Sequence, residues 1–220
     1  MGKGIKSVLL CIVLLLSVST NVFAAEVTPN ADPVENITSE FSGKMRSNAA
    51  YMAYYAYTET RDFGTYPVMT GEEFVSKVKT RGPWDYKFPY GYSKPWIFAG
   101  VTTTGEDLGN IHYGYVGRAA GFTDLILKSA AGVYQIYSGT YHIGWYASYF
   151  DDPKDQIAIQ RGLNYWANGN LPSTFSLTQE RQELIDTLTE EQKQEIEQNV
   201  KEKAGELGLT ATNGAVTPEK

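Results

Sequence analysis

Carboxylates and histidines in the middle of the chain could carry out acid–base hydrolysis. Such a reaction needs a proton donor and an acceptor with separated pKa values. We predict Asp85, His112 and Asp155 as the catalytic residues. Asp85 lies between Trp84 and Tyr86, where partial desolvation would raise the pKa of its carboxyl group.

Each of these candidates also has a structural explanation. Asp85 could pair with Lys87 in a loop, and His112 could be a buried, hydrogen-bonded histidine. Asp155 falls in the first turn of a predicted helix, where a carboxylate interacts favourably with the helix dipole. Asp152 is best explained as the N-cap of that helix.

Four polar side chains close to these candidates could bind a substrate: Lys87, Asn110, Tyr113 and Gln135. Two of them lie in a segment with glycines at 109, 114, 117 and 121. Such glycines let helices pack closely or let backbone approach a ligand, and close packing is the stronger interpretation. His142 has aromatic neighbours and is interpreted as a packing residue.

The sequence predicts no metal and no cofactor. The two histidines, His112 and His142, are far apart, and the single cysteine, Cys11, lies near the N-terminus, so a zinc site lacks ligands. A metal held by the aspartates at 151, 152 and 155 alone remains open, although Pro153 interrupts them and their spacing fits no calcium loop well. No phosphate-binding loop, nucleophile elbow or dinucleotide fingerprint is present.

The first 24 residues are typical of a cleavable export signal. Lys3 and Lys6 precede the apolar run 8–16, and small residues flank Phe23 before the expected cleavage after Ala24. The apolar run is shorter than the roughly 20 residues that a spanning helix needs. We predict a secreted protein, extracellular or periplasmic, with no membrane span in its mature form.

Charge and aromatic residues divide the remaining chain. After Ala24 it carries no cysteine and has 17 lysines and arginines against 25 acids, a net charge of −8. The segment 45–165 is neutral, whereas 166–220 is acidic. All 16 tyrosines and all four tryptophans lie between Tyr51 and Trp166, which predicts the folded core there.

Periodicity predicts a mainly α-helical α+β single domain with a C-terminal helical hairpin. Helices are expected over 38–60, from a Thr70–Glu73 capping box to Gly82, over 124–137 and over 153–168. Any strands fall in the aromatic-rich middle, where 84–97 is irregular and 102–109 is a polar loop. We expect a leader over 25–37, a domain over 38–169, an acidic hairpin over 170–209 with helices starting at Thr178 and Thr189, and a disordered tail over 210–220.

Four ordered blocks resemble the bacterial polymorphic toxin type 44 family. They are Gly82-Pro-Trp-Asp-Tyr-Lys87, Leu108-Gly-Asn-Ile-His-Tyr-Gly-Tyr-Val-Gly-Arg-Ala-Ala-Gly-Phe122, Ala130-Ala-Gly-Val-Tyr-Gln135 with Ser138-Gly139, and Asp151-Asp-Pro-Lys-Asp-Gln-Ile157 with Gly162. The resemblance implies a secreted effector used in bacterial competition, with nuclease activity as one expectation. A toxin of this kind could have an immunity protein as partner.

Three functions remain open. The first is a hydrolase of a bacterial envelope polymer, peptidoglycan, which fits the export signal and the supply of carboxylates near aromatic residues. The second is a ribonuclease-type toxin that uses His112 or His142 with Lys87 and Arg118 on RNA, although phosphate binding normally needs clustered positive charge. The third is a non-enzymatic wall- or glycan-binding module. We rank them in that order.

Overall fold

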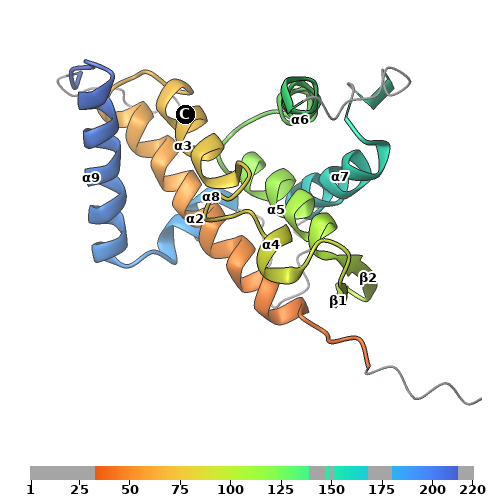
Figure 1. Cartoon of the computed structure of the whole chain (residues 1–220). Helices are drawn as coiled ribbons and strands as arrows, with labels where there is room; N and C mark the ends of the chain where they lie inside the picture. The colour runs from red at the N-terminus through yellow and green to blue at the C-terminus, as the bar shows by residue number, and fades with distance from the viewer. Residues whose placement is uncertain (1–32, 139–146, 149–150, 168–179, 213–220) are drawn as a thin grey trace, which may run out of the picture. The chain divides into compact units, whose positions relative to one another are not determined.

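The protein is predominantly helical with one small sheet, as expected. The computed structural model describes residues 33–138, 147–148, 151–167 and 180–212, without the side chains of 133–138 and 180. In chain order its elements are α2 (Thr38–Asp62), α3 (Val68–Val78), α4 (Lys87–Tyr90), β1 (Pro95–Phe98), β2 (Val101–Thr104), α5 (Gly105–Ala119), α6 (Asp124–Ser138), α7 (Pro153–Ala167), α8 (Glu180–Asp186) and α9 (Glu190–Glu206) (Figure 1). The predicted export signal and most of the leader lie outside the described residues.

Helix α2 is the central element of the core. Its buried side recurs about every helical turn, through Phe41, Met45, Ala49 and Met52. Helices α3, α5, α8 and α9 and strand β1 all pack against it. The helix predicted over 38–60 is therefore present.

The strands form a hairpin in the aromatic middle, where strands were expected. Strand β1 pairs antiparallel with β2, and the two residues between them, Ala99 and Gly100, have φ values of 55° and 74°. Two positive φ angles are typical of the tight turn whose twist matches paired strands. The polar loop predicted over 102–109 is wrong, because Thr104 and Asp107 form a capping box that starts α5.

The start of α3 also differs from the prediction. Helix α3 begins at Val68, so Thr70 lies inside it and forms no capping box with Glu73. Instead, the buried carboxylate of Glu59, from α2, accepts hydrogen bonds from the backbone N–H groups of Met69 at 2.9 Å and Thr70 at 2.7 Å. The α3 N-terminus is thus capped by a side chain from another helix.

Helices α6 and α7 begin at their predicted caps. Thr123 Oγ1 accepts a hydrogen bond from the Ile126 amide at 3.2 Å, and Asp152 Oδ1 accepts one from the Lys154 amide at 2.8 Å. A cap of this kind satisfies an N–H group that has no partner within the helix. His142, which follows α6 in the sequence, is outside the described residues.

Two glycines let α5 and α7 cross closely. A Cβ atom at Gly114 would overlap the carbonyl oxygen of Ile159, and one at Gly162 would overlap that of Ile111. At Gly117 a Cβ atom would strike the side chain of Leu127. At Gly114 and Gly117, the glycine-rich segment therefore serves close packing between helices.

The C-terminal helices dock on α2. Leu184, Leu188, Ile196 and Val200 are buried in the common core. The predicted capping box of Thr189 and Gln192 opens α9.

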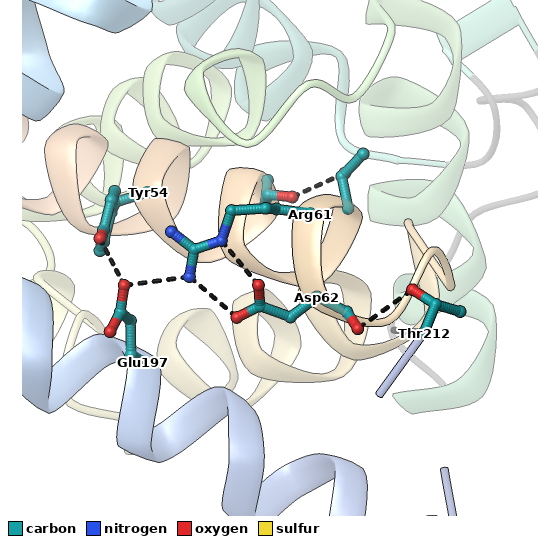
Figure 2. Close-up of polar contacts among 7 residues, drawn as sticks. Tyr54, Arg61, Asp62, Glu197 and Thr212 are labelled. Atoms are coloured by element: carbon teal, nitrogen blue, oxygen red, sulfur yellow. Dashed lines mark hydrogen bonds and ion pairs between the residues drawn. The ribbon is translucent and has the colours of Figure 1, made fainter. Parts of the chain in front are cut away.

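Figure 2 shows the polar side of this contact. Glu197 of α9 accepts hydrogen bonds from Tyr54 Oη at 2.7 Å and Arg61 Nη2 at 3.0 Å. Farther along, the Thr212 hydroxyl donates to the carbonyl oxygen of Asp62 at 3.2 Å. The Thr212 amide donates to the same oxygen at 2.8 Å, so the expected disorder from Thr210 onward does not hold for 210–212. In the described part of the chain, no helix combines the length and apolar character that crossing a membrane requires.

Candidate functional site

Asn110 and Asp155 meet where α5 crosses α7. Asn110 Nδ2 donates a hydrogen bond to Asp155 Oδ1 at 2.9 Å, and both side chains are half-buried. The residues come from different helices, 45 positions apart, and the glycine contacts between the helices hold them together. A carboxyl group and a fixed amide donor are thus brought to one place. We call it the Asp155 site.

The environment of Asp155 favours a protonated carboxyl group. Burial raises the pKa of Asp155 to about 7, and the negative charges of Glu106, Asp151 and Asp152 add to this effect, whereas Lys87 opposes it. A carboxyl group with a pKa near neutrality can donate a proton in one step and accept one in another. Strong shifts of this kind concentrate at functional sites.

Glu106 is a second carboxylate at this site that the sequence did not single out. It lies in the first turn of α5, close enough for its charge to act on Asp155. Its carboxylate forms an ion pair with Lys154 of α7 at 3.8 Å. The capping pattern from Thr104 to Asp107 would have placed Glu106 at a helix start.

Asp151 supplies a fixed, buried acid behind the site. Gln156 Nε2 donates to Asp151 Oδ2 at 2.6 Å and to the carbonyl oxygen of Lys128 at 3.2 Å. The Asp151 amide also donates to the carbonyl oxygen of Ser148 at 3.0 Å. Gln156 therefore acts as an orienting amide that fixes the Asp151 carboxylate.

The predicted binding residues have different positions. Lys87 begins α4 and lies near enough for its charge to lower the pKa of Asp155, so it borders the site. Tyr113 instead donates its hydroxyl proton to the carbonyl oxygen of Leu127 at 2.9 Å, a contact between α5 and α6. The side chain of Gln135 lies outside the described residues.

The geometry does not support the catalytic role predicted for His112. The residue has 0% exposure, and the rings of Trp84 and Tyr86 lie 5.6 and 4.7 Å from its ring. Burial lowers its pKa to about 3, so the imidazole is neutral at any physiological pH. Its Nε2 contacts the Asn48 amide at 3.0 Å. His112 is therefore the buried, hydrogen-bonded histidine that the sequence offered as the alternative to a catalytic residue.

Asp85 also has a structural role. Its Oδ2 accepts a hydrogen bond from the Arg81 amide at 2.7 Å, and the side chain is buried. Arg81 has a φ of 62°, in the left-handed region that side chains other than glycine seldom adopt. Asp85 therefore fixes a strained turn. The Asp85 carboxylate bonds to the Arg81 amide instead of forming the predicted pair with Lys87.

The described residues hold no group of three or more His, Cys, Asp or Glu side chains arranged for a metal ion. The fold and the site together define a class: a small helical domain with a half-buried carboxyl group whose pKa is raised to about 7.

The comparison with protein families narrows this class. Residues 97–168 match the family model described as bacterial toxin 44. This segment runs from β1 to the end of α7 and contains Glu106, Asn110 and Asp155. The match confirms the resemblance seen in the sequence and is to a bacterial toxin domain. No curated protein and no solved structure matches the chain.

Proposed function

We propose that this toxin domain is an acid–base hydrolase that cleaves the glycan of the bacterial envelope, peptidoglycan. The observation that carries the proposal is the Asp155 site, where burial and neighbouring acids raise the pKa of one carboxyl group to about 7. Glycoside cleavage uses two carboxyl groups, one of which must remain protonated near neutral pH. Asp155 meets this requirement, and Glu106 is the nearby carboxylate for the second role.

The chemistry assigns a task to each group. Asn110 donates a hydrogen bond to Oδ1 of Asp155 and so orients the carboxyl group that carries the transferable proton. Asp155 gives this proton to the glycosidic oxygen as its bond to the sugar carbon breaks. The Glu106 carboxylate stabilises the positive charge that develops on the sugar. A water molecule then forms a bond to the sugar carbon and gives one proton back to Asp155, which restores the acid.

The acidic surroundings favour a glycan over RNA. Glu106, Asp151 and Asp152 create a negative field at Asp155 that would repel a scissile phosphodiester. A glycosidic bond carries no charge and meets no such barrier. The predicted export signal completes the proposal, because it would bring the enzyme to the envelope.

The test compares two substrates. The chain from Ala25 onward is incubated with purified sacculi and, separately, with total RNA. We expect soluble sugar fragments from sacculi, and a loss of roughly 100-fold or more in rate for Asp155→Asn, as for removal of a general acid. Asp186→Asn, a change at an exposed acid on α8, is the matched control and should keep full activity. Degradation of RNA with intact sacculi would contradict the proposal.

A further inference from the structure

An exposed aromatic pair lies beside the Asp155 site, outside the segment that matches the toxin family. Phe88 is 42% exposed and Tyr92 is 45% exposed, and their ring centroids lie 5.6 Å apart at an angle of 85°. Phe88 belongs to α4, and Tyr92 follows it before β1. Large exposed rings grouped in this way are typical of binding surfaces rather than of ordinary surface.

Cations lie over both rings. The guanidinium of Arg81 is 4.9 Å from the Phe88 centroid, and the ammonium of Lys87 is 5.6 Å from that of Tyr92. From 77 to 96 the chain has five lysines and arginines and a single acid, Asp85. This positive stretch stands out in a chain with an overall excess of acids. We call Arg81, Lys87, Phe88 and Tyr92 the cation–aromatic platform.

The fold attaches this platform to the Asp155 site. The Glu106 amide donates to the carbonyl oxygen of Tyr92 at 3.2 Å. A Cβ atom at Gly105 would overlap the carbonyl oxygen of Gly91, so the Gly91–Tyr92 loop lies directly against the start of α5. Lys87, whose charge acts on Asp155, belongs to both groups. In Figure 1, α4 lies beside the first turns of α5.

The platform is held in place by the turn that precedes it. Arg81 adopts its left-handed conformation because the buried Asp85 carboxylate accepts its N–H group. A Cβ atom at Gly82 would collide with three backbone carbonyl oxygens, so only glycine fits next to Arg81. Backbone strain that the structure maintains in this way is common where a side chain must be aimed at a ligand. Here it directs the Arg81 guanidinium over Phe88.

We propose that the cation–aromatic platform is a subsite for a carboxylate-bearing glycan, next to the bond that the Asp155 site cleaves. The exposed faces of Phe88 and Tyr92 would stack on the C–H faces of sugar rings, and Arg81 and Lys87 would pair with carboxylates. Peptidoglycan offers both groups, because its sugars carry peptides with free carboxylates. This inference rests on the proposed function and specifies the substrate class.

The experiment measures binding apart from cleavage. Chain from Ala25 onward that carries Asp155→Asn is mixed with intact sacculi, and the bound fraction is followed by co-sedimentation. Adding Phe88→Ala and Tyr92→Ala should weaken binding about tenfold, which corresponds to about 1.4 kcal/mol. Tyr57→Ala is the matched control, since Tyr57 is 51% exposed with Arg61 over its ring at 5.4 Å, on α2. It should bind as the parent does.

A second substitution tests the cation. Arg81→Lys keeps the charge but loses the planar fork that pairs with a carboxylate, and Arg81→Ala loses both. Binding should be strongest for the parent, weaker for Arg81→Lys and weakest for Arg81→Ala. The differences in binding among the three proteins should shrink when the carboxylates of the sacculi are amidated. Equal binding by all three proteins would overturn the role of Arg81.

The outcomes separate the two proposals. If the native chain cleaves sacculi but the platform variants bind like the parent, the platform proposal fails and the hydrolase stands. If sacculi are bound through the platform but never cleaved, the hydrolase fails and the platform stands. If the platform variants lose binding to single-stranded RNA and none binds sacculi, the glycan assignment is overturned.

Discussion

At the scale of single residues, the chemistry of Asp155 depends on its surroundings more than on its type. The sequence named Asp155 among several aspartates and also explained it as a helix-terminus residue. Burial and three neighbouring acids raise the pKa of Asp155 and distinguish it from the other aspartates. One of these acids, Glu106, precedes Asp155 by 49 positions and belongs to another helix, α5. Spacing along the chain could not reveal this, because the two helices meet only through packing.

Asp155→Asn should be more stable than the native protein at alkaline pH. The pKa of Asp155 is about 7 in the folded state, against an ordinary value of 3.8 for an aspartate, so between these values the folded chain keeps a proton that the unfolded chain releases. The free energy of unfolding of the native protein therefore falls as pH rises from about 4 to 7. Asp155→Asn lacks this loss, so at pH 8 its free energy of unfolding should exceed that of the native protein by about 1–2 kcal/mol. This figure is smaller than the full pKa shift would give, because solvent screens a side chain that is half-exposed.

Urea unfolding at pH 4.5 and pH 8 measures this difference. The two proteins should converge at the lower pH, and Asp186→Asn should follow the native protein throughout. A variant that is less stable at pH 8 would mean that the Asp155 carboxylate stabilises the fold, contrary to its assignment.

His112→Phe should reduce the sensitivity of the fold to acid while leaving hydrolysis intact. The folded pKa of His112 is about 3, below the ordinary 6.5, so on acidification the unfolded chain takes up a proton and the folded chain does not. Unfolding is therefore favoured as pH falls below 6.5, by about 2 kcal/mol at pH 5. A phenyl ring has no nitrogen to titrate, so His112→Phe lacks this pH dependence, although it also loses the contact with Asn48.

Thermal unfolding between pH 7 and pH 5 checks the prediction for His112. The decrease in Tm should be smaller for His112→Phe than for the native protein, and His142→Phe serves as the control at the other histidine. An unchanged pH dependence with lost hydrolysis would instead return His112 to the catalytic group.

At the scale of elements, the sequence predicted what neighbouring residues determine. Thr123, Asp152 and Thr189 cap their helices as their types and spacing indicate. The start of α3 was missed because its cap, Glu59, belongs to α2. The sequence placed strands in the aromatic middle but did not predict the turn between them. Its residues, Ala99 and Gly100, are not the pair that usually marks such a turn.

Gly162→Ala should destabilise the protein and displace the Asp155 site. The added methyl group would meet the Ile111 carbonyl oxygen, backbone that cannot move without separating α5 from α7. Overpacking of this kind costs about 1–3 kcal/mol. Gly43→Ala is the matched control on α2, where a Cβ atom meets nothing, and it should stabilise by about 0.5–1 kcal/mol.

Urea midpoints and rates of sacculus hydrolysis measured together test this packing. We expect Gly162→Ala to lose activity even under conditions where it remains folded, because Asn110 and Asp155 sit on the two separated helices. Full activity in a folded Gly162→Ala protein would show that the site tolerates the displacement.

At the scale of the whole molecule, α8 and α9 belong to the same core as the segment that matches the toxin family. The sequence predicted a helical hairpin in this acidic region but not the surface that it covers. That surface is α2, which lies far earlier in the chain and contacts both helices (Figure 1). A long-range contact of this kind leaves no local pattern, so only the structure identifies the partner face.

Val200→Ala should therefore weaken the entire domain, and Glu197→Gln should not. Val200 is fully buried, and loss of buried methyl groups costs about 1–3 kcal/mol. Glu197 is a partly exposed partner of Arg61 and Tyr54 (Figure 2), and surface ion pairs contribute less than about 1 kcal/mol. Tryptophan fluorescence during urea unfolding is the measurement, because all four tryptophans lie between 84 and 166, outside α9. If Val200→Ala lowers the urea midpoint of the tryptophan transition, α9 unfolds together with the fold that carries the Asp155 site. If the midpoint is unchanged, α9 unfolds independently of that fold.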